Sequence, residues 1–193
     1  MNVVDSVNVR DITSGITLAP SMIYEIKDVE SLNSILTNSP AVAIMTLNAS
    51  GNIVNSSNQT ICSLKEAISK LDFKVIPAFR LASGCTAEAA ANMIADLKLI
   101  DVMFVSKDAA EIKAVRDINY KMLGVLDYST QNLNSKTLSD IRAETLTSGA
   151  KICILPASKA TQANTEFLNT LGVTVWYSAQ TNTEVEMFTF VTS

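Results

Sequence analysis

Four charged side chains stand at or near the ends of short apolar runs, where they are best placed to do chemistry. They are Glu25, Lys27, Arg80 and Asp127. Carboxylates can serve as a general acid and base, or as oxygen ligands for a divalent cation. The Arg80 guanidinium could bind a phosphate or a carboxylate through two hydrogen bonds. Arg80 could equally pair with Asp127 or Glu25 inside the protein, so the sequence leaves a binding role and an internal role open.

Histidine is absent from the whole chain. This excludes Ser–His and Cys–His nucleophile pairs, imidazole metal ligands and histidine acid–base catalysis. The three cysteines, Cys62, Cys85 and Cys153, are widely spaced and odd in number, so they fit neither a zinc motif nor a disulfide framework. We expect buried thiols, no metal site and no cofactor. The single tryptophan, Trp176, could stack on a sugar or a lipid headgroup, or could pack in the core.

The composition describes a chain that can form one domain with a sizeable core. It has 193 residues, of which 48% are hydrophobic, and a formal net charge of −4. Such an acidic chain lacks the basic field that binds a phosphate backbone, so we expect no nucleic-acid partner. No apolar run approaches the roughly 20 residues of a membrane span. The first residues show no basic region followed by an apolar stretch, so no signal peptide is visible.

Short apolar runs alternate with segments of helical period from residue 21 onward. The runs predict strands at 21–27, 41–47, 73–81, 101–106, 121–129, 150–156 and 173–178. Polar residues that favour helix N-caps precede the helical segments: Asp28, Ser63, Thr86, Ser139 and Ser158. Gly149 and Gly172 follow helical segments, where a left-handed C-cap is expected.

Repeated strand–helix units predict an α/β fold with a parallel sheet. An open doubly wound sheet would favour a glycine-rich phosphate loop after the first strand, which this chain lacks. We therefore predict a (β/α)₈ TIM-barrel-like domain over residues 21–193, with residues 1–20 as an N-terminal extension. A barrel of this kind places functional residues at the C-terminal ends of its strands. The weak ligand-binding candidates are consequently Glu25, Lys27, Arg80, Asp127 and Trp176.

The eighth strand of such a barrel is not evident in the sequence. The last segment, TEVEMFTFV at 183–191, is expected to be a helix that runs to the end of the chain. Either the N-terminal stretch SGITLAP at 14–20 supplies the closing strand, or the chain is a fragment that stops early. We favour the fragment. Unpaired edge strands could also lead to a dimer.

The order of motifs resembles the glycerophosphodiester phosphodiesterase family over about residues 22–193. The resemblance is carried by VAIMTLNASGNIV, by SLKEAISKL leading into KVIPAFR, by DVMFVSKDAAEIKAVRDI and by VTVWYSAQTNTEVEMF. It implies a TIM barrel and, in complete members of the family, metal-assisted hydrolysis of phosphodiesters in lipid metabolism.

The resemblance also implies which catalytic groups are missing. The family has a His-Arg pair at the end of the first strand, a Glu-x-Asp in the second strand, a second histidine, and a Glu-x-Lys in the third. The matching positions here are Tyr24 to Lys27, then Val42 and Ile44, then Ser57 and Asn58, then Ala78 and Arg80. Valine and isoleucine provide no oxygen ligand for a hard cation. Nearly every position that supports metal-assisted cleavage in the family has thus changed, and Arg80 stands where the family keeps a lysine.

Three hypotheses follow from these observations. The first is a non-catalytic barrel domain, a pseudoenzyme that acts as an accessory, ligand-binding or partner-binding module of a larger protein. The pattern is similar to that of non-catalytic domains that precede a complete phosphodiesterase domain in longer bacterial proteins. The second is a divergent phosphodiesterase that hydrolyses glycerophosphodiesters. The third is an unrelated sugar-binding or small-molecule-binding α/β domain with an open sheet of seven strands.

We favour the non-catalytic module. Its expected partners are a small phosphorylated or polyol ligand and a neighbouring domain of a longer chain, without nucleic acid and without a transmembrane segment. The resemblance further implies a bacterial origin and an extracytoplasmic or cell-surface location.

Overall fold

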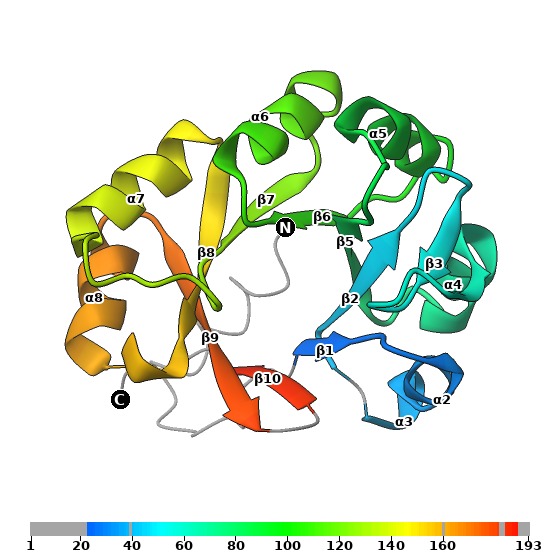
Figure 1. Cartoon of the computed structure of the whole chain (residues 1–193), viewed down its shortest axis with the longest axis horizontal. Helices are drawn as coiled ribbons and strands as arrows, with labels where there is room; N and C mark the ends of the chain where they lie inside the picture. The colour runs from blue at the N-terminus through cyan, green and yellow to red at the C-terminus, as the bar shows by residue number, and fades with distance from the viewer. Residues whose placement is uncertain (1–22, 39, 160, 182–183, 189–193) are drawn as a thin grey trace.

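The computed structural model describes residues 23–38, 40–159, 161–181 and 184–188. Its strands curve into a barrel-like sheet with the helices outside (Figure 1). All seven strands expected from the apolar runs are present. They are β1 (Ile23–Glu25), β2 (Val42–Leu47), β5 (Ile76–Leu81), β6 (Met103–Ser106), β7 (Leu123–Asp127), β8 (Ala150–Pro156) and β9 (Thr174–Thr181).

These seven strands are parallel and lie side by side in the order in which the chain makes them. A doubly wound sheet would reverse its strand order at a switch point. The observed order has no such reversal, so the predicted TIM-barrel-like fold is confirmed. A short hairpin, β3 (Asn52–Val54) and β4 (Thr60–Ser63), extends from β2 outside the barrel order.

The prediction of a helix at 183–191 is wrong. Residues Glu184–Phe188 form strand β10, which pairs antiparallel with β9. This strand also lies next to β1, so it occupies the eighth position of the barrel (Figure 1). Among the described residues no backbone ladder joins β10 to β1. The stretch 14–20, considered above as a closing strand, lies outside the described residues.

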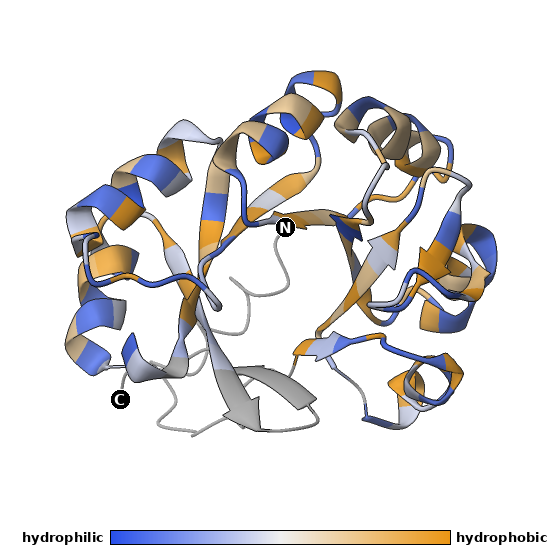
Figure 2. Ribbon diagram, in the orientation of Figure 1, coloured by the Kyte–Doolittle hydropathy of each residue, from blue (hydrophilic) through white to orange (hydrophobic). Residues whose placement is uncertain are grey.

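The helices lie on the outer side of the sheet and turn their apolar faces toward it (Figure 2). They are α2 (Val29–Asn33), α3 (Ile35–Asn38), α4 (Leu64–Leu71), α5 (Ala87–Ala95), α6 (Ala109–Ile118), α7 (Leu138–Thr147) and α8 (Gln162–Thr170), with a 3₁₀ turn at Ala157–Lys159. Asp28, Ser63 and Thr86 cap helices as predicted, each accepting a backbone N–H bond. Gly149 and Gly172 have φ of 80° and 86°, the left-handed conformation expected after a helix.

The predicted N-cap residues of α7 and α8 are wrong. Thr137 and Thr161, rather than Ser139 and Ser158, accept the backbone bonds at the starts of α7 and α8.

The barrel interior is a separate apolar cluster, distinct from the layer between helices and strands. Side chains alternate along each strand, and those that point inward stack in layers taken from alternate strands. One layer comes from β1, β5, β7 and β9 and contains Ile23, Ala78, Val125 and Trp176. The layers from β2, β6 and β8 contain Ile44, Val105 and Ile154, then Val42, Met103 and Ile152. Small Ala78 and large Trp176 share one layer, as close packing of a tapered interior requires.

Candidate functional site at the barrel mouth

Glu25, Arg80 and Asp127 meet at the C-terminal ends of their strands. The Arg80 Nη1 donates to Glu25 Oε1 at 2.9 Å, and its Nη2 donates to Asp127 Oδ2 at 2.8 Å. The Asp127 side chain is only 1% exposed, whereas those of Arg80 and Glu25 are about one quarter exposed. The internal pairing that the sequence left open for Arg80 is therefore confirmed, and it involves both acids at once.

The alternation of the barrel explains why these three residues meet. Each lies two positions beyond an interior residue of its own strand: Glu25 beyond Ile23, Arg80 beyond Ala78, and Asp127 beyond Val125. They come from the alternate strands β1, β5 and β7, so they form the next layer toward the mouth. The second Asp127 oxygen, Oδ1, accepts the backbone N–H of Ser129 at 2.9 Å. The buried carboxylate is thus held on both oxygens.

The other two sequence candidates lie elsewhere. Trp176 belongs to the interior layer below the mouth and is 1% exposed. Among the described residues its indole Nε1–H finds no hydrogen-bond partner. This position favours the packing role, and the ligand role of Trp176 stays an untested prediction. Lys27 is exposed two residues beyond Glu25, and its backbone N–H donates to Ser31 Oγ.

The loop after β7 carries a polar cluster that sequence reasoning missed. The Tyr128 hydroxyl donates to Glu144 Oε2 at 2.8 Å, and Lys136 also donates to that oxygen. The Lys136 ammonium lies 5.2 Å from the centre of the Tyr128 ring. Burial, together with the bond to Glu144, raises the pKa of Tyr128. The three residues are too far apart in the sequence for any local pattern to reveal their contact.

The electrostatics of Glu144 show the strength of this cluster. Burial raises the pKa of Glu144, but the hydrogen bonds from Lys136 and Tyr128 outweigh it and leave that pKa below its usual range. The cluster ties the loop that follows Asp127 to helix α7, so it supports the mouth from outside.

The mouth does not fit a divalent cation. The two carboxylates nearest its centre, Glu25 and Asp127, already bind the Arg80 guanidinium. Val42, Ile44 and Ala78, which match metal or catalytic carboxylates in the resemblance, lie in the apolar interior and offer no donor atom. Across the described part of the chain no group of three or more Cys, Asp or Glu side chains could hold a metal ion.

Comparison with solved structures identifies the architecture. A glycerophosphodiester phosphodiesterase from Agrobacterium tumefaciens matches with a TM-score of 0.62 and 10% identity, over 84% of this chain and 88% of that one. The chain has the fold of the glycerophosphodiester phosphodiesterases. A phosphodiesterase from Oleispira antarctica, solved with its product sn-glycerol-3-phosphate, matches with a TM-score of 0.64 and 11% identity, over 84% of this chain and 85% of that one.

A third match reaches a higher identity. A glycerophosphoryl diester phosphodiesterase from Parabacteroides distasonis is 17% identical, with a TM-score of 0.57, over 87% of this chain and 76% of that one. No protein-family profile and no curated protein sequence matches the chain. At these identities the likeness concerns the phosphodiesterase fold, and the chemistry must be argued from the residues at the mouth. No described helix has the length and apolar character needed to cross a bilayer.

Proposed function

We propose that this chain is a non-catalytic domain built on the phosphodiesterase fold. The observation that supports this most is the Arg80 guanidinium held between Glu25 and Asp127. With both Nη atoms bonded to carboxylates, the Arg80 fork is already occupied by internal acids in the geometry that it would use to bind a substrate phosphate. The positions matched to metal-binding carboxylates are apolar and buried. The chain has no histidine to activate water, and both carboxylates of this layer are bound to Arg80.

The charge at the mouth favours a polyol over a phosphorylated ligand. Two carboxylates against one guanidinium leave one formal negative charge in this layer. A phosphate would add negative charge beside the buried Asp127 carboxylate, which is electrostatically unfavourable. Glycerol-like hydroxyl groups can instead donate to Glu25, which remains partly exposed. We therefore propose a neutral polyol as the small ligand of the mouth.

The module is further proposed to work within a longer bacterial protein, next to another domain and outside the cytoplasm. This role is compatible with the mildly acidic charge of the chain. The retained phosphodiesterase fold supports it as a scaffold, because barrels keep their fold when their site residues change.

The decisive experiment is hydrolysis of glycerophosphocholine by the purified chain, with Mg²⁺ or Ca²⁺ added. We expect no turnover above a heat-denatured control. A metal-dependent rate that disappears in Arg80→Ala would instead establish a divergent phosphodiesterase. Calorimetric titration with each cation provides a second readout. Binding of either cation at the mouth with a micromolar dissociation constant would overturn the non-catalytic proposal. It would mean that Glu25 and Asp127 can leave Arg80 and bind the cation instead.

A further inference from the structure

Three neighbouring loops at the amino end of the barrel expose large apolar side chains. Phe73, Ile100 and Tyr120 are 94%, 90% and 76% exposed. They lie in the loops that lead into β5, β6 and β7, which are adjacent strands. This end is opposite the mouth that holds Arg80. A group of exposed aromatic and aliphatic side chains on one surface marks an interaction site.

Two pockets run beneath these side chains and share a wall. The smaller, of about 320 Å³, is lined by Ala41, Phe73 and Pro77 among others. The larger, of about 760 Å³, lies between the ends of α5 and α6. Lys98, Leu99 and Ile100 line both of them. The two pockets are therefore adjacent, and together we call them the groove; its lining extends from Ala41, before β2, to Lys121, before β7.

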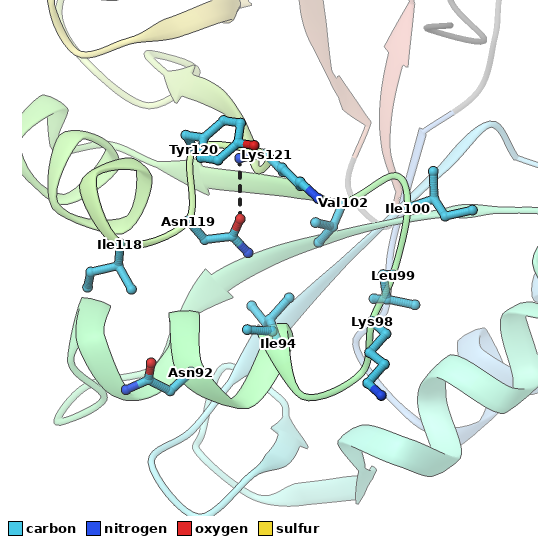
Figure 3. A pocket seen from close by; sticks show the side chains of 11 residues that line it. Asn92, Ile94, Lys98, Leu99, Ile100, Val102, Ile118, Asn119, Tyr120 and Lys121 are labelled. Atoms are coloured by element: carbon cyan, nitrogen blue, oxygen red, sulfur yellow. Dashed lines mark hydrogen bonds between the residues drawn. The ribbon is translucent and has the colours of Figure 1, made fainter.

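The larger pocket combines an apolar floor with positive charge. Figure 3 shows Ile94 and Val102 pointing into it, and Lys121 extending across it. Lys98 and Lys121 belong to its lining without an acidic side chain, and the smaller pocket adds Lys74 and Asp101, so basic residues outnumber acidic ones along the groove. Groups of this kind suit a chain segment that carries aliphatic side chains together with carboxylates.

The start of strand β1 lies beside this groove. Ile23, the first described residue, pairs with Val42 across the β1–β2 ladder. The residue before Val42 is Ala41, which lines the smaller pocket. Neighbouring strands lie about 4.8 Å apart, so Ile23, the residue at which the described part of the chain begins, lies at the edge of the groove.

The sequence of the extension matches the chemistry of the groove. It contains seven aliphatic Val, Ile and Leu residues, among them Val7 and Val9 in alternation with polar neighbours. It also contains Asp5 and Asp11, against the single basic side chain of Arg10. From β1 to β7 there are four strand spacings, roughly 20 Å, which about six extended residues cover. The extension is therefore long enough to reach both lysines.

We propose that residues 1–20 bind along this groove, with aliphatic side chains between Phe73 and Tyr120 and with Asp5 or Asp11 near Lys98 and Lys121. The extension covers the amino end of the barrel and removes the exposed aromatic surface from water. This inference is independent of whether the mouth is catalytic.

Photo-crosslinking in the full chain tests the proposal. Tyr120→p-benzoylphenylalanine places a reactive aromatic group at a position already exposed, so the fold should tolerate it. Labelled and unlabelled copies are mixed before irradiation, and crosslinked peptides are identified by mass spectrometry. We expect crosslinks to residues 1–20 within the same chain. The matched control places the same probe at Phe167, a partly exposed residue of α8, and should give none to that segment.

A charge test completes the experiment. Lys98→Glu/Lys121→Glu should lower the crosslinking yield several-fold, whereas Lys65→Glu/Lys107→Glu, at two other exposed lysines, should leave it unchanged. Crosslinks that join labelled to unlabelled copies would show that a second copy fills the groove and would overturn the proposal. The absence of crosslinks to residues 1–20 would overturn it as well.

Discussion

The guanidinium of Arg80 lies 2.8 Å from the buried carboxylate of Asp127, reaching past β6, the strand between their own strands β5 and β7. The same guanidinium contacts Glu25 on the other side, past β2. One side chain thus connects three alternate strands of the barrel. This makes the layer at the mouth a structural cross-link as well as a candidate site.

The first prediction concerns the stability that Arg80 supplies. Arg80→Ala leaves the Asp127 carboxylate buried without its cation, so we expect the free energy of unfolding to fall by about 3 kcal/mol. Arg80→Lys keeps the charge but cannot donate to both acids in a fork. Its free energy of unfolding should therefore lie between those of Arg80→Ala and the wild type. Urea denaturation at neutral pH measures the three values.

The control for this prediction is Lys113→Ala. Lys113 pairs with Asp117 on the exposed face of α6, and such a pair contributes about 0.5 kcal/mol or less. If the free energy of unfolding of Arg80→Ala is no lower than that of Lys113→Ala, then Arg80 does not stabilise the mouth and is available to bind a ligand.

The strands could be predicted from the sequence because both of their faces are buried. A strand such as Ala150–Pro156 has an almost continuous apolar sequence, which stands out from the polar helices around it. The sequence left two roles open for Arg80: internal pairing with Asp127 or Glu25, and ligand binding. The choice between them required the barrel register, which places residues 55 and 47 positions apart in contact.

Strand β10 was missed because it lies at the end of the chain, where length and capping signals are weak. Its sequence, Glu-Val-Glu-Met-Phe, does alternate in the period of a strand. The hairpin β3–β4 was missed for another reason: its two strands are short and their connection is rich in Asn and Ser. Its pairing with β2 and the burial of Ile53 and Cys62 in the core stabilise it, and both depend on the tertiary fold.

The second prediction concerns the cluster beside the mouth. Tyr128→Phe removes one hydrogen bond to the Glu144 carboxylate without changing the size of the ring, so the free energy of unfolding should fall by about 1–2 kcal/mol. Amide exchange in the loop after β7 should also become faster. Lys136→Met removes the other donor, and the two substitutions should show a coupling energy in a double-mutant cycle. Strictly additive effects would mean that the two donors act independently.

The third prediction tests the packing of α6 against the sheet at Gly124. A Cβ atom there would lie 2.7 Å from Ile112 Cγ2 and 3.1 Å from the Cα of Ala150. Gly124→Ala should therefore destabilise the fold by about 1–3 kcal/mol. Ile112→Leu lacks the obstructing methyl and should recover part of that loss in the double variant. Gly84→Ala, whose Cβ would meet no atom but whose φ is +82°, is the contrast, because Ile112→Leu should not relieve its strain.

The fourth prediction concerns Cys153, which lies on β8 with its thiol fully buried. Burial raises the pKa of this thiol from 9.0 to about 12, because the thiolate is poorly solvated inside the protein. Between these pH values the unfolded chain releases the proton while the folded chain keeps it, so stability falls as the pH rises, by about 1.4 kcal/mol per pH unit at most. Cys153→Ala should be less stable at pH 8 because of the cavity, yet should lose less stability between pH 9 and pH 11 than wild type does. Cys62→Ala, at a cysteine of the hairpin, serves as the comparison, and denaturant melts at each pH give the slopes. Equal slopes for wild type and Cys153→Ala would show that this thiol ionises as readily in the folded protein as in the unfolded chain.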